Sequence, residues 1–316
     1  MAKWTLILVV VASALWSGWW ILGARGIDAA VEEGLTQIER QGWRIEREDV
    51  SVAGFPNRFD VTLTEPRITA PTGWQLAAPI LRAFALSYRP NHIIAVAPSE
   101  MVVSHPLAGE IDVTSADLRA SVIVTASANP VLDRATLAAE AVRVTGQGGA
   151  VTLAQGQIAT RQAAGPTVHD LAVNLIDITA PGLDGPIETF DMDATVTLDR
   201  ALGARQPARL DRLDLRSADI AWGDVRASLS GEMSVMSDGT PRGTFALRLT
   251  GWEPFLNRAV DVGLIPEGQA PLVAAGLRGL TDDDGQATVP VALEDGFLLV
   301  LGFPVTQVPR LPVPGR

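Results

Sequence analysis

The chain contains no cysteine, which excludes disulfide bonds, a thiolate nucleophile and zinc sites built on cysteine. Histidine occurs only at His92, His105 and His169, and none of the three has the spacing of a known metal motif. No G-x-S-x-G sequence is present to hold a serine nucleophile on a sharp turn. We therefore expect surface or turn positions for the histidines, no metal or cofactor, and no enzymatic activity.

Basic residues are few: 25 Lys and Arg stand against 36 Asp and Glu, which gives a net charge of −11. Nucleic-acid binding needs clustered cations to neutralise phosphates, so a nucleic-acid partner is not expected. The same balance provides no electrostatic attraction to anionic lipid head groups. Aromatic residues make up only 5% of a chain that is 47% hydrophobic, so apolar surfaces must be built mainly from aliphatic side chains.

The one long apolar run stands near the N-terminus, where residues 4–24 carry no charge: WTLILVVVASALWSGWWILGA. About twenty apolar residues are enough for one helix to cross the hydrocarbon core of a bilayer. Trp16, Trp19 and Trp20 gather in its second half, and tryptophan favours the membrane interface. The run predicts a transmembrane anchor over residues 1–24.

The charges on either side of this run predict its orientation. Lys3 precedes it, and acidic residues follow soon after Arg25, which favours a cytoplasmic N-terminus and a periplasmic main domain at the inner membrane. The alternative is a signal peptide cleaved after the A-x-A sequence Ala12-Ser13-Ala14, which would release the protein into the periplasm.

A second helical pattern follows directly. Ile27, Val31, Leu35 and Ile38 recur at helical spacing and predict an amphipathic helix over residues 25–42 that ends near Gly42. After this point the period of the apolar residues changes from helical to two.

The stretch TFDMDATVTLD is the clearest example of this alternation, since every second residue from Phe190 to Leu198 is apolar. Such alternation indicates a strand with one apolar and one solvated face. In GFPNRFDVTLTEP, the residues Gly54-Phe55-Pro56-Asn57 are typical of a tight turn. Folding the chain back there predicts the cross-strand pairs Val52–Phe59 and Val50–Val61.

The same pattern predicts three more hairpins, so residues 43–316 are expected to form an antiparallel meander. Their predicted cross-strand pairs are Val144–Val151 and Val142–Leu153, Val235–Phe245 and Met233–Leu247, and Leu293–Phe297 and Val291–Leu299. The last hairpin would turn through Glu294-Asp295-Gly296 with glycine in the left-handed position.

Between residues 252 and 280 the period is helical again and predicts two short helices separated by Pro266 and Pro271. The proline-rich tail after Phe303 predicts an edge strand or an extended arm. Two further motifs are interpreted as turns. Residues 146–149 lack the lysine of a phosphate-binding loop, and Asp282-Asp283-Asp284-Gly285 lacks the alternating ligands of a calcium loop.

The stretches GFPNRFDVTL, RPNHIIAVAP and LEDGFLLVLGFP resemble an uncharacterised family of alphaproteobacterial proteins. The resemblance extends over most of the chain, and it implies an N-terminal anchor and a periplasmic β-rich domain. The family has no known activity, so it implies no catalytic residue. At the level of architecture the chain also looks like AsmA-type envelope proteins, in which long curved sheets enclose an apolar groove for lipids.

We expect a mainly β fold in which residues 43–316 form a large curved antiparallel sheet, and the apolar face of that sheet has to be covered. If a ligand covers it, the protein binds or passes a hydrophobic molecule such as a lipid. If a second layer of protein covers it, the protein is a structural or interaction module of the cell envelope with a protein partner. The residues expected to line a groove are Val50, Val52, Phe59, Val61, Leu63, Phe190, Met192 and Val196.

Overall fold

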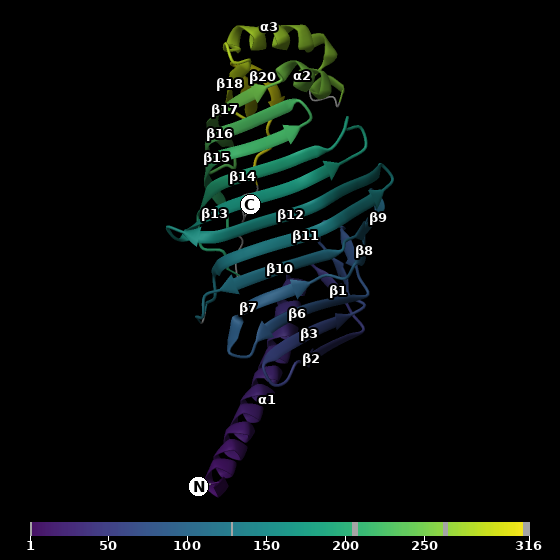
Figure 1. Cartoon of the computed structure of the whole chain (residues 1–316), viewed down its shortest axis with the longest axis vertical. Coiled ribbons are helices and arrows are strands. Elements are labelled where there is room, and N and C mark those ends of the chain that lie inside the picture. Colours follow the sequence, from purple (N-terminus) through teal and green to yellow (C-terminus); the bar gives the residue numbers. More distant parts are fainter. Residues whose placement is uncertain (1, 128, 204–207, 262–264, 312–316) are drawn as a thin grey trace. The chain divides into compact units, whose positions relative to one another are not determined.

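The structure is a computed structural model that describes residues 2–127, 129–203, 208–261 and 265–311 (Figure 1). The described residues form antiparallel strands with three α-helices and one short 3-10 helix, which confirms the predicted mainly β fold. Contacts divide the chain into two compact units. Unit 1 comprises Met1–Ile123 and Val142–Gly148, and unit 2 comprises Val124–Ala141 and Gly149–Arg316.

Unit 1 consists of a long helix and an antiparallel meander. The helix is α1 (Ala2–Arg40). The strands are β1 (Arg44–Glu46), β2 (Asp49–Ala53), β3 (Arg58–Thr64), β4 (Arg67–Thr69), β5 (Gln75–Ala77), β6 (Ile80–Leu86), β7 (Arg89–Val96), β8 (Glu100–His105), β9 (Gly109–Thr114), β10 (Asp117–Val124) and the end of β11 (Leu132–Gly146).

Strands β1 to β10 are the parts of five long strands, each of which is interrupted once. Backbone hydrogen bonds continue across the interruptions, for example from the N–H of Glu48 to Thr64 O (3.0 Å) and from the N–H of Ser115 to Ser99 O (2.9 Å). Three of the interruptions contain a proline, at Pro66, Pro79 and Pro98. Proline has no N–H to donate to a strand ladder, which accounts for a break at these positions.

The N-terminal helix is confirmed, and it is one continuous helix where two segments, 1–24 and 25–42, were predicted. Its end agrees with the prediction, because Gly42 has a φ of +91° and its N–H donates to Glu39 O (2.9 Å). Glycine adopts this left-handed conformation without steric cost, so it is a common residue just after a helix. The ion pair between Arg47 and Glu32 (2.7 Å) ties the helix to the meander.

Among the residues that the structure describes, no helix combines the length and hydropathy that crossing a membrane requires. The side chains of residues 1–6, 8, 9 and 14, which belong to the predicted span, lie outside the description. The transmembrane character of α1 is therefore not supported by the structure and stays a prediction.

Unit 2 is a regular antiparallel meander in which each strand pairs with the next from β12 to β20. Its strands are the beginning of β11, then β12 (Gly149–Ala163), β13 (Gly165–Thr179), β14 (Ile187–Leu198), β15 (Leu210–Trp222), β16 (Val225–Val235), β17 (Pro241–Thr250), β18 (Gln286–Glu294), β19 (Phe297–Val300) and β20 (Phe303–Gln307). The last strand pairs only with β19 among the described residues, so the tail begins as the predicted edge strand.

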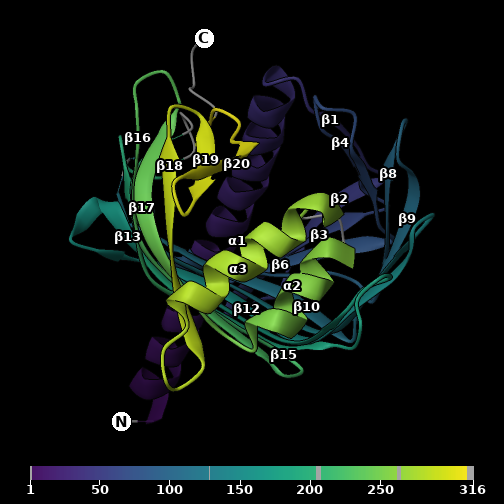
Figure 2. The same ribbon diagram turned by 90° about the horizontal axis from the view of Figure 1, so that it is seen from above.

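The predicted helical pair is also confirmed. It consists of α2 (Trp252–Asp261), the 3-10 helix η1 (Glu267–Gln269) and α3 (Ala270–Leu280). Figure 2 shows α2 and α3 together at the end of the unit 2 meander, where α3 contacts β18 and α2 contacts β16.

Three of the predicted hairpins are present with a different register. Val52 pairs with Val61 and Val50 with Leu63, a shift of two residues that keeps both pairs on one face. In the β16–β17 hairpin the shift is four residues, since Val235 pairs with Pro241 and Leu247 with Leu229. A shift by an even number preserves the face because side chains alternate with period two.

The β18–β19 hairpin departs further from its prediction. Its turn has two residues, Asp295 (φ +49°) and Gly296 (φ +82°), where three were expected. Glu294 therefore pairs with Phe297, and Leu293 with Leu298. Two consecutive residues with positive φ are typical of a type I′ turn, for which Asp-Gly is a preferred sequence. The odd shift places Phe297 on the face opposite to the predicted one.

Candidate functional site

The apolar face of unit 2 is organised as rows of side chains across β13, β14 and β15. The three predicted lining residues of this unit all lie on β14 and are partly buried. Register places them in the rows Leu175–Phe190–Ile220, Val173–Met192–Ala218 and His169–Val196–Leu213, and a further row, Leu171–Ala194–Leu215, lies between the last two. The rows extend about 20 Å along β14, at ~3.3 Å per residue.

One end of the unit 2 sheet is closed by the helical pair. Trp252 and Leu256 of α2 and Leu277 of α3 form a buried cluster with Leu249, Ala287 and Val289 of the sheet. This cluster is the packed core of the unit. The side chains of β14 are not among the residues buried in it or packed against it.

The predicted surface or turn position is wrong for His169, which lies fully buried on the apolar face of β13, between Gln162 and Val196. Neither ring nitrogen has a hydrogen-bond partner among the described residues. The segment after β14 reaches this area, since Leu202 O accepts from the N–H of Leu132 (2.7 Å) and Leu132 O accepts from the Gln162 amide (2.7 Å). The alternation of His169 with Leu171 and Val173 was a sequence signal for its place on the apolar face, but this pattern does not specify which residues cover the ring.

The other predicted lining residues, Val50, Val52, Phe59, Val61 and Leu63, lie together in unit 1 on β2 and β3. Phe59 is 3% exposed, and Trp20 of α1 stacks on its ring. Gly23 of the same helix lies so close that a Cβ there would come within 2.7 Å of the Phe59 ring. The long helix therefore covers the Phe59 end of this group.

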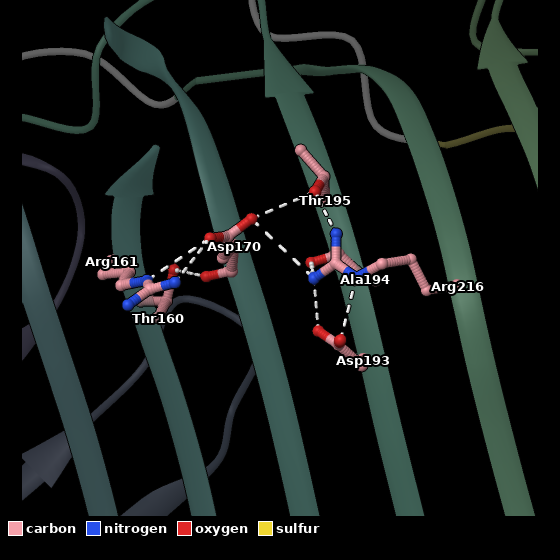
Figure 3. A network of polar contacts seen from close by, with 7 residues as sticks. All are labelled: Thr160, Arg161, Asp170, Asp193, Ala194, Thr195 and Arg216. Atoms are coloured by element: carbon pink, nitrogen blue, oxygen red, sulfur yellow. Dashed lines mark hydrogen bonds and ion pairs between the residues drawn. The ribbon is translucent and has the colours of Figure 1, made fainter. Parts of the chain in front are cut away.

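The opposite face of unit 2 is polar and cross-linked by ion pairs (Figure 3). Arg216 donates through Nε to Asp193 (2.8 Å) and through its terminal nitrogens to Asp193 and Thr195. Thr195 in turn donates to Asp170 (3.0 Å), which also accepts from Arg161 (3.2 Å). Adjacent residues of a strand point to opposite faces, so Asp170 belongs to this network while His169 does not.

Within this network, Arg216 favours the ionised form of Asp193. The hydrogen bond from Arg216, together with its positive charge, holds the pKa of Asp193 below its ordinary value of 3.8. The same pairing raises the pKa of Arg216. A carboxylate with a lowered pKa is a poor proton donor near neutral pH, so the arrangement fits a structural network better than general acid catalysis.

The other two histidines, and Asp282 in one of the predicted turns, have hydrogen-bond partners within the protein. His92 Nε2 lies 2.9 Å from Ser121 Oγ, and His105 Nδ1 accepts from the N–H of Leu107 (3.1 Å). Asp282 accepts from the backbone N–H groups of Asp284 and Gln286 within its own turn. In the described part of the chain, no three His, Asp or Glu side chains come together as a metal site.

Unit 1 contains a hollow that sequence reasoning missed. It has a volume of about 510 Å³ and lies along the strand interruptions. Its walls include the carboxylates of Glu65, Glu100 and Asp112 next to apolar residues such as Met101 and Val113. The sequence signal for this hollow was only the spacing of Pro66 and Pro79. That spacing does not specify that the two strand interruptions lie side by side. The mixed walls do not indicate one ligand chemistry.

Comparison with known families gives one match. The model of a family described as "Uncharacterized protein conserved in bacteria (DUF2125)" matches residues 20–309. No curated protein and no solved structure matches the chain. The match supports the predicted resemblance to a family of unknown function, while an alphaproteobacterial origin, membrane anchoring and similarity to AsmA-type proteins stay predictions.

Proposed function

Because the chain belongs to this uncharacterised bacterial family, whose description names no activity, we propose a function from the geometry of its sheet. We propose that unit 2 binds an elongated hydrophobic ligand, such as the acyl chain of a lipid, along the apolar face of β13, β14 and β15. The observation that carries this proposal is the set of apolar rows through Phe190, Met192 and Val196. These three side chains stay partly exposed outside the cluster packed under the helices, while Ala194 and Leu215 in the row between the last two are buried.

The energetics favour an apolar ligand over a polar one. Each methylene group transferred from water to an apolar surface contributes about 0.8 kcal/mol. The rows offer apolar side chains with only His169 as a titratable group, whereas charged and hydroxyl side chains such as Asp193 and Thr195 point to the opposite face. We propose binding or passage of the ligand and no catalysis.

We further propose that α1 anchors the protein in the inner membrane, with a cytoplasmic N-terminus and periplasmic β units. The uncharged run over residues 4–24 and its tryptophans support this location. Cleavage after Ala14 is the alternative, and it would leave Trp16 and Trp20 in the mature chain. A tethered protein with an apolar face is suited to receive a ligand from the lipid phase.

A second candidate function is an envelope interaction module with a closed core and a protein partner. The observation that favours it is the buried cluster around Trp252, Leu256 and Val289, which joins the helical pair to the sheet. If a partner extends this packing over β14, the same rows of side chains would form a protein interface.

Photo-cross-linking separates these two functions in the full chain. A benzophenone amino acid in place of Met192 lies on the apolar face, and the same substitution of its neighbour Asp191 is a matched control on the polar face. We expect a lipid-sized adduct on irradiation of cells only for position 192. A protein adduct at 192 without lipid would support the interaction module, and equal labelling at both positions would contradict a lipid-binding face.

A further inference from the structure

The tip of the β2–β3 hairpin is fixed to α1 by two tryptophans. Trp16 Nε1 donates to Pro56 O (3.0 Å), and Trp20 Nε1 donates to Arg58 O (2.9 Å). Trp20 also contacts Phe55 edge-on, with ring centroids 5.4 Å apart. These contacts satisfy both indole N–H groups and hold the hairpin tip at the level of the helix that carries the two tryptophans.

Apolar side chains cover most of the rest of this helical segment. Trp16, Trp20 and Gly23 lie on the side of α1 that faces the hairpin, as their contacts show. At 100° per residue, most of the remaining circumference is occupied by side chains that are more than half exposed, or nearly so: Val10, Val11, Leu15, Trp19, Ile21 and Leu22. A short arc carries Ser13 and Ser17, and the Ser17 hydroxyl donates to Ser13 O (2.7 Å). A helix that packs only on protein needs a single apolar stripe, whereas an uncharged helix that is apolar over most of its circumference is typical of a lipid environment.

The length of the free apolar segment limits where a bilayer can lie. Between the charge of Lys3 and the first hairpin-bound tryptophan, Trp16, the uncharged part of α1 is Trp4–Leu15. Twelve helical residues extend about 18 Å, well short of the ~30 Å hydrocarbon core. A bilayer that surrounds α1 therefore has to extend past Trp16. Because the hairpin tip is bound to Trp16, the tip then lies at the level of the bilayer.

We propose that the β2–β3 hairpin tip, Phe55 and Pro56, enters the head-group layer of a phospholipid bilayer beside Trp16 and Trp19. Phe55 is 55% exposed and projects an aromatic ring from the tip. The indole and phenyl rings suit the boundary between head groups and acyl chains. Unit 1 then sits directly on the membrane, held by the helix and the hairpin together. This inference rests on the proposed membrane anchor.

The absence of native cysteine allows one label to be placed at a time on the full chain. Asn57→Cys labels the hairpin tip and Leu15→Cys labels the helix. Leu107→Cys is the matched control, because Leu107 is 93% exposed at the β8–β9 turn, at the opposite end of the same meander. Each variant carries an environment-sensitive fluorophore and is reconstituted into phosphatidylcholine–phosphatidylglycerol vesicles with lipids that bear a nitroxide quencher near the head group.

We expect the labels at positions 57 and 15 to lose most of their emission and the label at 107 to keep it. Phe55→Asp should restore the emission at 57 in the Asn57→Cys background and leave the emission at 15 unchanged in the Leu15→Cys background. Quenching at 15 but not at 57 would overturn the hairpin proposal and leave the anchor intact. No quenching at either position would overturn both, and the unquenched label at 15 would identify the anchor as the failed premise.

Discussion

Trp20 of α1 stacks on Phe59 of β3, with ring centroids 6.0 Å apart and an angle of 22° between the planes. Trp20 was predicted to face the membrane interface, and the contact shows that its ring also packs against the meander. Phe59 was predicted to line a groove, and it lies buried beneath the helix. Close packing between these two rings is therefore one part of the join between helix and sheet.

Gly23→Ala should destabilise this join. The new Cβ would meet the buried Phe59 ring at 2.7 Å, and overpacking of this kind costs about 1–3 kcal/mol. Gly26→Ala is the matched control, since nothing lies within 4 Å of its Cβ position and alanine favours a helix by about 0.5–1 kcal/mol. Urea unfolding of the full chain, followed by tryptophan fluorescence, measures both. Equal effects of the two substitutions would contradict the packing.

Replacing the buried imidazole of His169 should have the opposite effect on stability. A buried polar group without a hydrogen bond costs about 1–3 kcal/mol, so His169→Leu should stabilise the protein and raise its Tm. His92→Leu should lower Tm, because it removes the contact with Ser121. If His169→Leu proves as destabilising as His92→Leu, the imidazole has a partner in solution.

The Asp193–Arg216 pair predicts a dependence on pH. The pKa of Asp193 is lower in the folded state than its ordinary value of 3.8, so the pair stabilises the protein above that pH. The contribution is lost as the pH falls through the lowered pKa. Asp193→Asn should therefore reduce stability at pH 7, by less than about 1 kcal/mol because both side chains are about half exposed.

Thermal unfolding of both proteins between pH 7 and pH 2 tests this prediction. The difference in Tm between wild type and Asp193→Asn should narrow below about pH 4, and it should shrink in high salt. A difference that stays constant over the whole range would show that ion pairing is not its cause.

Much of the fold could be predicted because it depends on local patterns. Alternation between Phe190 and Leu198 specified β14 and its two faces, and helical spacing specified α2 and α3. Registers were less accurate because loop length decides them. In the β18–β19 hairpin, Asp295-Gly296 forms a two-residue turn, and this moved Phe297 to the other face.

The features that sequence reasoning missed all depend on distant contacts. The aligned interruptions of unit 1 require Pro66 and Pro79 to lie on neighbouring strands, and the docking of the hairpin on Trp16 and Trp20 joins residues about 40 positions apart. Neither has a local period. Beside His169, the Gln162 amide donates to Leu132, and Leu132 in turn donates to Leu202 after β14, so these contacts also join distant positions. The sequence therefore predicted the apolar faces of the candidate site, but not which segments cover each part of those faces.

Native mass spectrometry of the full chain released from detergent micelles tests the lipid-binding face most directly. We predict that the wild type retains a lipid-sized mass that Met192→Asp loses, while Met192→Leu and the polar-face control Asp191→Asn retain it. Circular dichroism confirms that each variant is folded, and lipids around α1 affect all four proteins equally. A wild type that carries no more lipid than a folded Met192→Asp variant would contradict a ligand on the apolar face.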